Sequence, residues 1–293
     1  MTPAISVVIP VLDMATTIGP CLDALVAQSF PASQFEVIVV DNGSTDGTPD
    51  VVRRYPVTLL HEPAPGACHA RNRGIAAARG ACIAFTDADC VPSRGWLAAF
   101  ARALTNDEID IVAGPLAVLD PEASVLSQYS ASLGQYAPER TLAHPTFPYA
   151  ATGNLCVRRA LFDAVGAFNP AFPTYDSAEF FWRLKQRGPV RSHVERRALV
   201  FYRTRASISA FVRQNYGYGL GAGRLMRQAD RAGRLAHGSA ALRAWRTRVS
   251  DAGSVARAST RGAWTRTATL VGLHVLRETA IATGFLAAAL IDH

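Results

Sequence analysis

The chain has 293 residues, of which 49% are hydrophobic and 18% are charged. This composition excludes an intrinsically disordered or fibrous protein and supplies enough apolar side chains for a sizeable core. The formal net charge is +7, and the excess of basic residues is concentrated in residues 201–293, which contain 14 arginines and 4 acidic residues. Such a segment binds an anionic partner or forms a solvated helical face.

Strands and helices alternate over the first 115 residues. Apolar runs rich in β-branched residues predict strands at 5–9, 35–40, 57–60, 81–85 and 109–113. Helical spacing and capping residues predict helices at 17–27, 45–54, 66–79 and 95–104. This alternation predicts an α/β fold whose mixed, mostly parallel sheet is sandwiched by helices.

The pattern changes after residue 120. Residues 120–150 predict a loop-and-helix region that walls a pocket, followed by a short strand at 152–157, a helix at 178–187 and an extended segment at 190–202. Beyond Ser207 the chain is predicted to be helical. Residues 267–291 are apolar, but Arg277 and Glu278 interrupt them, so we expect a buried or interfacial amphipathic helix and no membrane span.

Four glycines alternate within this helical region, at positions 217, 219, 221 and 223. A dinucleotide-binding loop places such glycines after a strand, whereas these follow a helical pattern. We therefore expect them to allow close contact between helices.

Three polar clusters, at residues 10–13, 41–46 and 87–89, follow predicted strands. In open α/β sheets, ligands bind beyond the carboxyl ends of the strands. Asp87 and Asp89 are two residues apart, and carboxylate oxygens at this spacing suit Mg²⁺ or Mn²⁺. The alternative for this pair is a helix N-cap with acidic neighbours.

Two further segments have a ligand-binding character. Asp41 precedes a turn rich in glycine and serine, where a carboxylate accepts hydrogen bonds from a base or ribose; an ordinary capped turn is the alternative. The segment GACHARNRG begins with Gly66 and carries Arg71, so it combines a helix start with a guanidinium that binds phosphate oxygens. The alternative is an exposed basic helical turn.

Two carboxylates, Asp176 and Glu179, precede a run of aromatic residues. A carboxylate beside aromatic rings has a raised proton affinity and suits a general base. The competing explanation is a helix N-terminus, which favours acidic residues through the helix dipole.

The chain has five widely spaced cysteines and no CxxC pair. A zinc knuckle or a redox motif is therefore not expected, and reduced thiols in the cytoplasm explain the cysteines most simply. No secretory signal is recognisable at the N-terminus. We expect a cytoplasmic protein, peripheral on the inner face of the membrane if the basic region binds lipid.

Six segments, taken together and in this order, resemble glycosyltransferase family 2, an inverting family with the GT-A fold. They are SVVIPVLD, VVDNGSTDGT, PGACHARNRGIAAARG, FTDADC, TGNLCVRRALFDAVGAF and EFFWRLKQRG, and they cover about residues 4–205. The resemblance implies a GT-A domain at 1–205 and leaves a basic helical region at 206–293, which associates with a membrane or a partner.

The same resemblance implies an activity. A sugar would pass from a nucleotide-diphosphate sugar, with UDP the favoured nucleotide, to a hydroxyl of a glycan or lipid-linked acceptor. A divalent cation, Mn²⁺ or Mg²⁺, would assist, and nucleic acid is not an expected partner.

Roles for individual residues also follow from the resemblance. Donor-nucleotide contacts are implied for Pro10, Asp13, Asp41, Arg71 and Asp87. Asp89 and Asp87 resemble the metal-binding DxD pair. Acceptor-side roles are implied for Gly153, Asn154, Trp182 and Arg183.

Two departures from the family pattern concern catalysis. The family's general base is an aspartate at the position that Ser177 occupies, so Asp176 or Glu179 would have to take that role. The stretch LVFYRTR lacks the histidine that often helps to bind metal in the family. A catalytically silent subunit that binds sugar nucleotides is therefore the alternative function. A nucleotidyltransferase is disfavoured, because no glycine-rich phosphate loop follows the first predicted strand.

Overall fold

The computed structural model describes residues 2–133, 136–232 and 264–291. The chain divides into two compact units. Unit 1 comprises Met1–Leu119 and Gln135–Arg203, and unit 2 comprises Asp120–Gly134 and Thr204–His293. Residues 233–263, which include part of the predicted basic helical region, lie outside the described residues.

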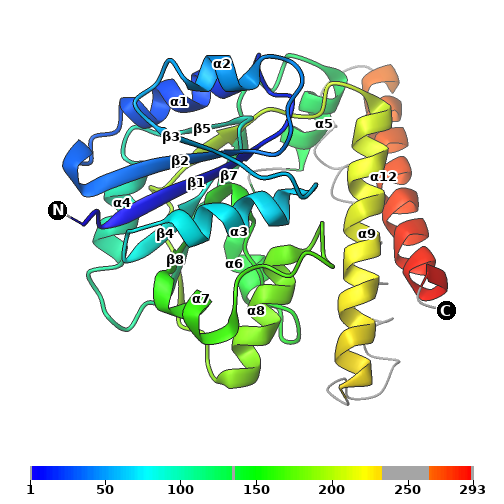
Figure 1. Cartoon of the computed structure of the whole chain (residues 1–293). Helices are drawn as coiled ribbons and strands as arrows, with labels where there is room; N and C mark the ends of the chain where they lie inside the picture. The colour runs from blue at the N-terminus through cyan, green and yellow to red at the C-terminus, as the bar shows by residue number, and fades with distance from the viewer. Residues whose placement is uncertain (1, 134–135, 233–263, 292–293) are drawn as a thin grey trace. The chain divides into compact units, whose positions relative to one another are not determined.

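Unit 1 is built on a seven-stranded sheet with the strand order β3-β2-β1-β4-β8-β6-β9. The strands are β1 (Ile5–Val11), β2 (Phe35–Asp41), β3 (Thr58–His61), β4 (Cys82–Phe85), β6 (Ile111–Ala113), β8 (Leu155–Arg158) and β9 (Ser192–Val194). The pairs formed by β1, β2, β3 and β4 are parallel, whereas β8 runs antiparallel to both β4 and β6. The mixed, mostly parallel sheet predicted from the sequence is therefore confirmed (Figure 1).

The central strands are apolar at nearly every position because both faces of the sheet are covered. In β1, for example, Val7 and Ile9 pack into one core and Val8 into the other. The first core is completed by α1 (Ile18–Val26), α2 (Thr48–Val52) and α4 (Trp96–Ala103). The second is completed by α3 (Ala67–Ala77), α7 (Arg159–Val165) and α8 (Asp176–Arg187).

A second, three-stranded sheet in unit 1 has the order β5-β10-β7. Its strands are β5 (Cys90–Pro92), β7 (Leu116–Val118) and β10 (Val200–Tyr202). Strand β10 pairs antiparallel with β5 and parallel with β7. Strand β5 begins directly after Asp89. The small sheet therefore holds the chain in place on the C-terminal side of the predicted metal-binding pair.

The predicted loop-and-helix region contains α5 (Val125–Ser132) and α6 (Pro138–Leu142), which belong to different units. Short 3₁₀ turns at Ala32–Gln34 and Thr152–Asn154 precede β2 and β8. All five cysteines are unpaired and buried in unit 1.

Unit 2 contains α5, α9 (Ile208–Arg231) and α12 (Trp264–Ile291). Helices α9 and α12 lie side by side along much of their length (Figure 1). A β-carbon added to Gly219 would lie 1.9 Å from the carbonyl oxygen of Ile281, and one added to Gly284 would lie 2.0 Å from that of Tyr216. The predicted close helix contact is thus confirmed, and the glycines let the two backbones touch.

One segment of α12, Thr269–Ala288, is long and apolar enough to cross a membrane when judged by length and composition. Arg277 and Glu278, which argue against a span, form an ion pair with each other within this segment. The hydroxyl of buried Tyr129 in α5 is hydrogen-bonded to Nδ1 of His274 in α12, at 3.1 Å. This bond joins α12 to α5.

Candidate functional site

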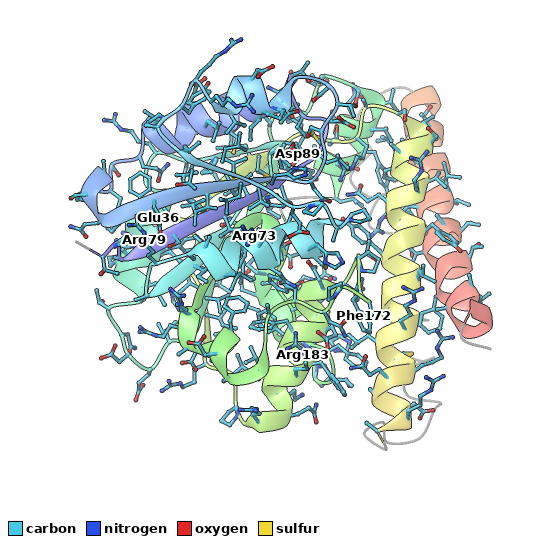
Figure 2. The ribbon with its side chains drawn as sticks, in the orientation of Figure 1. Glu36, Arg73, Arg79, Asp89, Phe172 and Arg183 are labelled. Carbon is cyan, nitrogen blue, oxygen red and sulfur yellow. The ribbon has the colours of Figure 1, made fainter. Side chains whose placement is uncertain are left out.

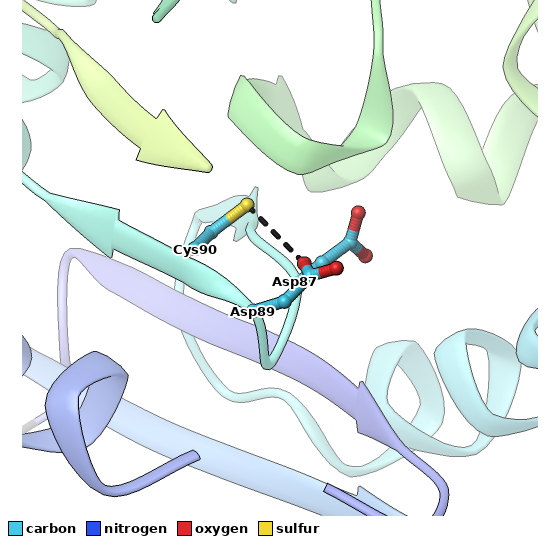
Figure 3. Close-up of side chains that lie close together, drawn as sticks. All are labelled: Asp87, Asp89 and Cys90. Carbon is cyan, nitrogen blue, oxygen red and sulfur yellow. Dashed lines mark hydrogen bonds between the residues drawn. The ribbon is translucent and has the colours of Figure 1, made fainter. Parts of the chain in front are cut away.

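Asp87 and Asp89 lie where β4 ends and β5 begins. The backbone N–H of Cys90 donates to the carbonyl of Asp87, and the N–H of Arg203 donates to that of Asp89. The backbone of this turn is therefore held from both sides, while the Asp87 side chain stays 36% exposed. One ligand atom from each of Asp87, Asp89 and Cys90 lies within 4.8 Å of the other two (Figure 3).

The three groups of this turn differ in their suitability for a metal ion. Burial, reinforced by the Asp87 and Asp89 carboxylates, raises the pKa of the Cys90 thiol well above its usual value. Without a bound metal ion this shift favours the protonated thiol, whose Sγ lies 3.7 Å from Oδ1 of Asp89. The two carboxylates offer hard oxygen ligands, which fit Mn²⁺ or Mg²⁺.

Arg71 lies on α3 and connects two carboxylates from distant parts of the sequence. Its Nη2 donates to Oδ1 of Asp87 at 2.9 Å, and its Nη1 donates to Oδ2 of Asp176 at 2.8 Å. Burial opposes the positive charge, but the Asp176 and Asp87 carboxylates outweigh it and raise the pKa of Arg71. The structure therefore brings together three of the predicted site residues.

Asp176 is the first residue of α8, and both of its carboxylate oxygens are engaged. Oδ1 accepts a hydrogen bond from the N–H of Ser177, and Oδ2 accepts from Arg71. The Cys68 thiol also lies 3.6 Å from Oδ2 and donates to the carbonyl of Phe172. Burial and the nearby Asp176 raise the pKa of Cys68 to about 12, so this thiol is a donor and not a charged nucleophile.

Glu179 lies one turn further along α8 and has a different partner. Both of its oxygens lie 2.9 Å from Nε of Arg183, and the side chain is 1% exposed. The Arg183 guanidinium also donates to the carbonyls of Val165, Gly166 and Ala167. Arg183 lies well apart from Asp89 (Figure 2), and Asp176 and Glu179 are thus paired with two different arginines.

The predicted donor side forms a second hydrogen-bonded cluster, at the ends of β1 and β2. Asp41 accepts from the N–H groups of Gly43 and Ser44, at 3.3–3.4 Å. Asp13, whose φ is 52°, accepts from the N–H of Thr45 at 2.7 Å. Pro10 pairs in register with Val40 on the neighbouring strand. The loops after these two strands therefore hold each other in place.

Two contacts of this cluster were not predicted from the sequence. Asp46 accepts from the N–H of Ala15, and the hydroxyl of Thr48 accepts from the N–H of Met14. Both contacts join the turn after β2 to the segment after β1. The polar residues at 44–48 hinted at such contacts, but only the fold supplies their partners.

On the predicted acceptor side, Gly153 and Asn154 have structural neighbours that explain them. A β-carbon at Gly153 would lie 3.2 Å from Oδ2 of Asp87. The Asn154 side chain is buried; it accepts from Nε1 of Trp96 and donates to the carbonyls of Pro115 and Ala198. Asn154 therefore fixes the backbone next to Asp87. Trp182 is buried in α8.

The family model described as "Glycosyl transferase family 2" matches residues 6–166. Two relatives are the glycosyltransferase AglE of Haloferax volcanii, 33% identical over 57% of this chain and 56% of its own, and the pre-mycofactocin glycosyltransferase of Mycobacterium tuberculosis, 29% identical over 82% and 52%. The chain spans about half the length of these relatives.

Solved structures show a similar fold. The mannosyltransferase PcManGT of Pyrobaculum calidifontis, solved with GDP-Man and Mn²⁺, is 22% identical. The similarity covers 100% of this chain and 87% of that one, with a TM-score of 0.62. S. aureus TarS gives a TM-score of 0.55 at 18% identity, over 97% of this chain and 55% of that one. At these identities the likeness establishes the fold alone, and that fold is GT-A-like.

Proposed function

Because the chain belongs to glycosyl transferase family 2, we propose that it transfers a sugar from a nucleotide-diphosphate sugar to a glycan or lipid-linked acceptor. The observation that carries this proposal is the position of Arg71 between Asp87 and Asp176. This contact links a carboxylate suited to a metal ion with one of the two carboxylates proposed as the general base.

Donor binding is assigned to the loops after β1 and β2 and to α3. Asp41 and Asp13 each accept hydrogen bonds from the loop after β2, and with Pro10 they border the place proposed for the base and ribose. UDP is the proposed nucleotide. Arg71 would compensate negative charge on the diphosphate, as guanidinium groups do for phosphate oxygens.

Asp87 and Asp89 are the residues proposed to hold Mn²⁺ or Mg²⁺. Their oxygens fit such an ion, and the ion would supply positive charge for the diphosphate leaving group. The carbonyls of both residues are fixed by hydrogen bonds. The protein therefore presents the two carboxylates from a turn that is already ordered.

The proposed reaction is a single in-line displacement. An acceptor hydroxyl attacks the anomeric carbon, the bond from that carbon to the diphosphate oxygen breaks, and the configuration inverts. Of the two carboxylates of α8, we assign the hydroxyl proton to Asp176, because Arg71 joins it to Asp87. Glu179 and Arg183 would support the start of α8, while Gly153, Asn154 and Trp182 would shape the acceptor side.

For the C-terminal region we propose a peripheral contact with an anionic membrane on its cytoplasmic side. Arginines make up most of the charged residues of 206–293, and α12 includes a segment of membrane-spanning length and composition. Within this proposal, residues 1–205 form the catalytic domain and 206–293 the associating region. Basic side chains near a surface of anionic lipid strengthen such binding.

A second function, a silent subunit that binds sugar nucleotide, has one observation in its favour. Ser177 lies between Asp176 and Glu179, and both carboxylates are buried in ion pairs with arginines. A carboxylate must be free of its cation to accept a proton readily. A protein with this arrangement could bind the donor without transferring its sugar.

A donor screen separates the two functions. The full chain would be incubated with UDP-, GDP-, dTDP- and CDP-sugars and Mn²⁺ or Mg²⁺, with and without chelator. Thermal shift reports binding, and release of nucleoside diphosphate reports turnover. Release that stops with chelator supports the metal-assisted enzyme. Binding without release, across glycan and lipid-linked acceptors, supports the silent subunit.

A further inference from the structure

Tyr175, the residue immediately before α8, combines two locally unfavourable features. Its φ is 67° and its ψ is 16°, so a bulky aromatic residue adopts the left-handed conformation. It also occupies the N-cap of α8 and makes no capping hydrogen bond with its side chain. Asparagine tolerates both the conformation and the N-cap position far better. Local stability therefore does not explain a tyrosine at this position.

The Tyr175 ring lies next to another tyrosine ring. Its centroid lies 5.7 Å from that of Tyr149, with an angle of 37° between the rings, and both residues are partly exposed. Tyr136 is connected to Tyr149 through Thr141. The Tyr136 hydroxyl lies 2.8 Å from that of Thr141, whose carbonyl accepts from the N–H of Tyr149. Three tyrosines therefore form one cluster, called here the tyrosine cluster.

Two independent chains of contact join the tyrosine cluster to Asp87. In the first, Tyr175 directly precedes Asp176, which is bound to Arg71 and through it to Asp87. In the second, Tyr136 exchanges backbone hydrogen bonds with Leu116, at 2.9 and 3.2 Å. A β-carbon at Gly153 would lie 3.8 Å from Leu116 and 3.2 Å from the Asp87 carboxylate. The cluster is thus built into the same part of unit 1 as Asp87.

We infer that Tyr175 and Tyr149 form an acceptor subsite that stacks against a pyranose ring of a glycan acceptor. This inference rests on the proposed function, because it assigns the substrate class of the same site. Aromatic faces provide a large, rigid apolar surface, and a phenol hydroxyl adds a polar contact at its edge. Backbone strain persists at functional positions when surrounding structure maintains it. The strain at Tyr175 places its ring beside that of Tyr149.

Two variants test the subsite. Tyr175→Asn removes the ring and favours the observed backbone, whereas Tyr175→Phe keeps the ring and the strain. The probes are the methyl glycosides of glucose, galactose, mannose and N-acetylglucosamine. Each is titrated into the full chain in the presence of UDP, the proposed nucleotide. We expect the wild type to bind at least one glycoside, Tyr175→Asn to bind it about tenfold more weakly, and Tyr175→Phe to bind it nearly as well.

Thermal unfolding supplies the second measurement. The inference requires Tyr175→Asn to melt no lower than the wild type, because the strain then serves binding and not folding. Equal glycoside binding by Tyr175→Asn, no binding of any glycoside to the wild type, or a clearly lower melting temperature of Tyr175→Asn would each overturn it. Release of nucleoside diphosphate by the wild type, measured separately, tests the proposed function, so the two failures are distinguishable.

Discussion

Arg71 and Asp176 are 105 positions apart in sequence and form a buried ion pair, with 2.8 Å between Nη1 and Oδ2. The same guanidinium binds Asp87. This pair connects α3 to α8, and the shared guanidinium links Asp87 to a carboxylate from a distant part of the sequence. The first predictions follow from it.

Replacing Arg71 with Met should destabilise the protein strongly. The Asp176 carboxylate would remain buried without its cation, a situation that costs about 3 kcal/mol or more. Urea unfolding measures the loss. Arg53→Met is the matched control, since Arg53 pairs with Asp50 at the surface and should change stability by less than about 1 kcal/mol. Equal losses in the two variants would contradict the structural role of Arg71.

Asp176→Asn should reduce sugar transfer about a hundredfold or more, because the proposed base is lost. Glu179→Gln should largely spare turnover and instead lower stability, since Glu179 holds Arg183 in a buried pair. Turnover is measured well below each variant's melting temperature. The opposite outcome, in which only Glu179→Gln loses turnover, would transfer the role of base to Glu179.

Asp89→Ala should abolish metal-dependent transfer while leaving the fold intact. The Asp89 carboxylate is part of the group that would hold the proposed cation, and loss of a ligand should lower turnover by about a hundredfold or more. Binding of Mn²⁺ and release of nucleoside diphosphate are the measurements, with circular dichroism to verify folding. Normal turnover by the folded variant would refute the metal assignment.

Gly284→Ala and Gly272→Ala should have opposite effects although both lie on α12. A β-carbon at Gly284 would lie 2.0 Å from the Tyr216 carbonyl, and overpacking of this kind costs about 1–3 kcal/mol. A β-carbon at Gly272 meets nothing within 4 Å, so alanine should stabilise the helix by up to about 1 kcal/mol. Thermal unfolding checks the pair, and effects of the same sign would argue against the close helix packing.

If α12 associates with a membrane, binding of the protein to lipid vesicles should depend on the exposed apolar side chains of this helix. Val275 and Leu286 are 58% and 66% exposed, so a double change to Ser should weaken binding to vesicles of phosphatidylglycerol and phosphatidylcholine by about tenfold or more. Val26→Ser is the control, because Val26 is also 58% exposed but lies in unit 1. Unchanged sedimentation with vesicles would mean that α12 does not contact lipid.

The sequence predicted the sheet well because its strands are uninterrupted apolar runs. β1 and β2, for example, were expected at 5–9 and 35–40 and are two residues and one residue longer. Asp87 was placed correctly at a strand end, because a buried strand followed by carboxylates leaves few alternatives. The membership of residues 120–134 in unit 2 could not be predicted, since it depends on contacts with helices more than 70 residues away.

Long-range contacts also explain what could not be predicted at the site. The family resemblance implied a donor-side role for both Arg71 and Asp87. The different partners of Asp176 and Glu179 depend instead on the contacts of α8 with α3 and α7. The Asn154 side chain contacts Trp96, which lies 58 positions away in sequence. The sequence therefore suggested only an acceptor-side role for Asn154 and not this structural role. The left-handed backbone of Tyr175 had no local signal, because tyrosine rarely adopts it.

The distribution of the five buried cysteines matches the division of the chain into two compact units. Every cysteine belongs to unit 1, and the sequence ranges of unit 2 contain none. Burial raises the pKa of all five, so an alkylating reagent should modify them only when unit 1 opens. The rate of thiol labelling would then follow the opening of unit 1, while the melting of α9 and α12 leaves it unchanged unless the two units unfold together.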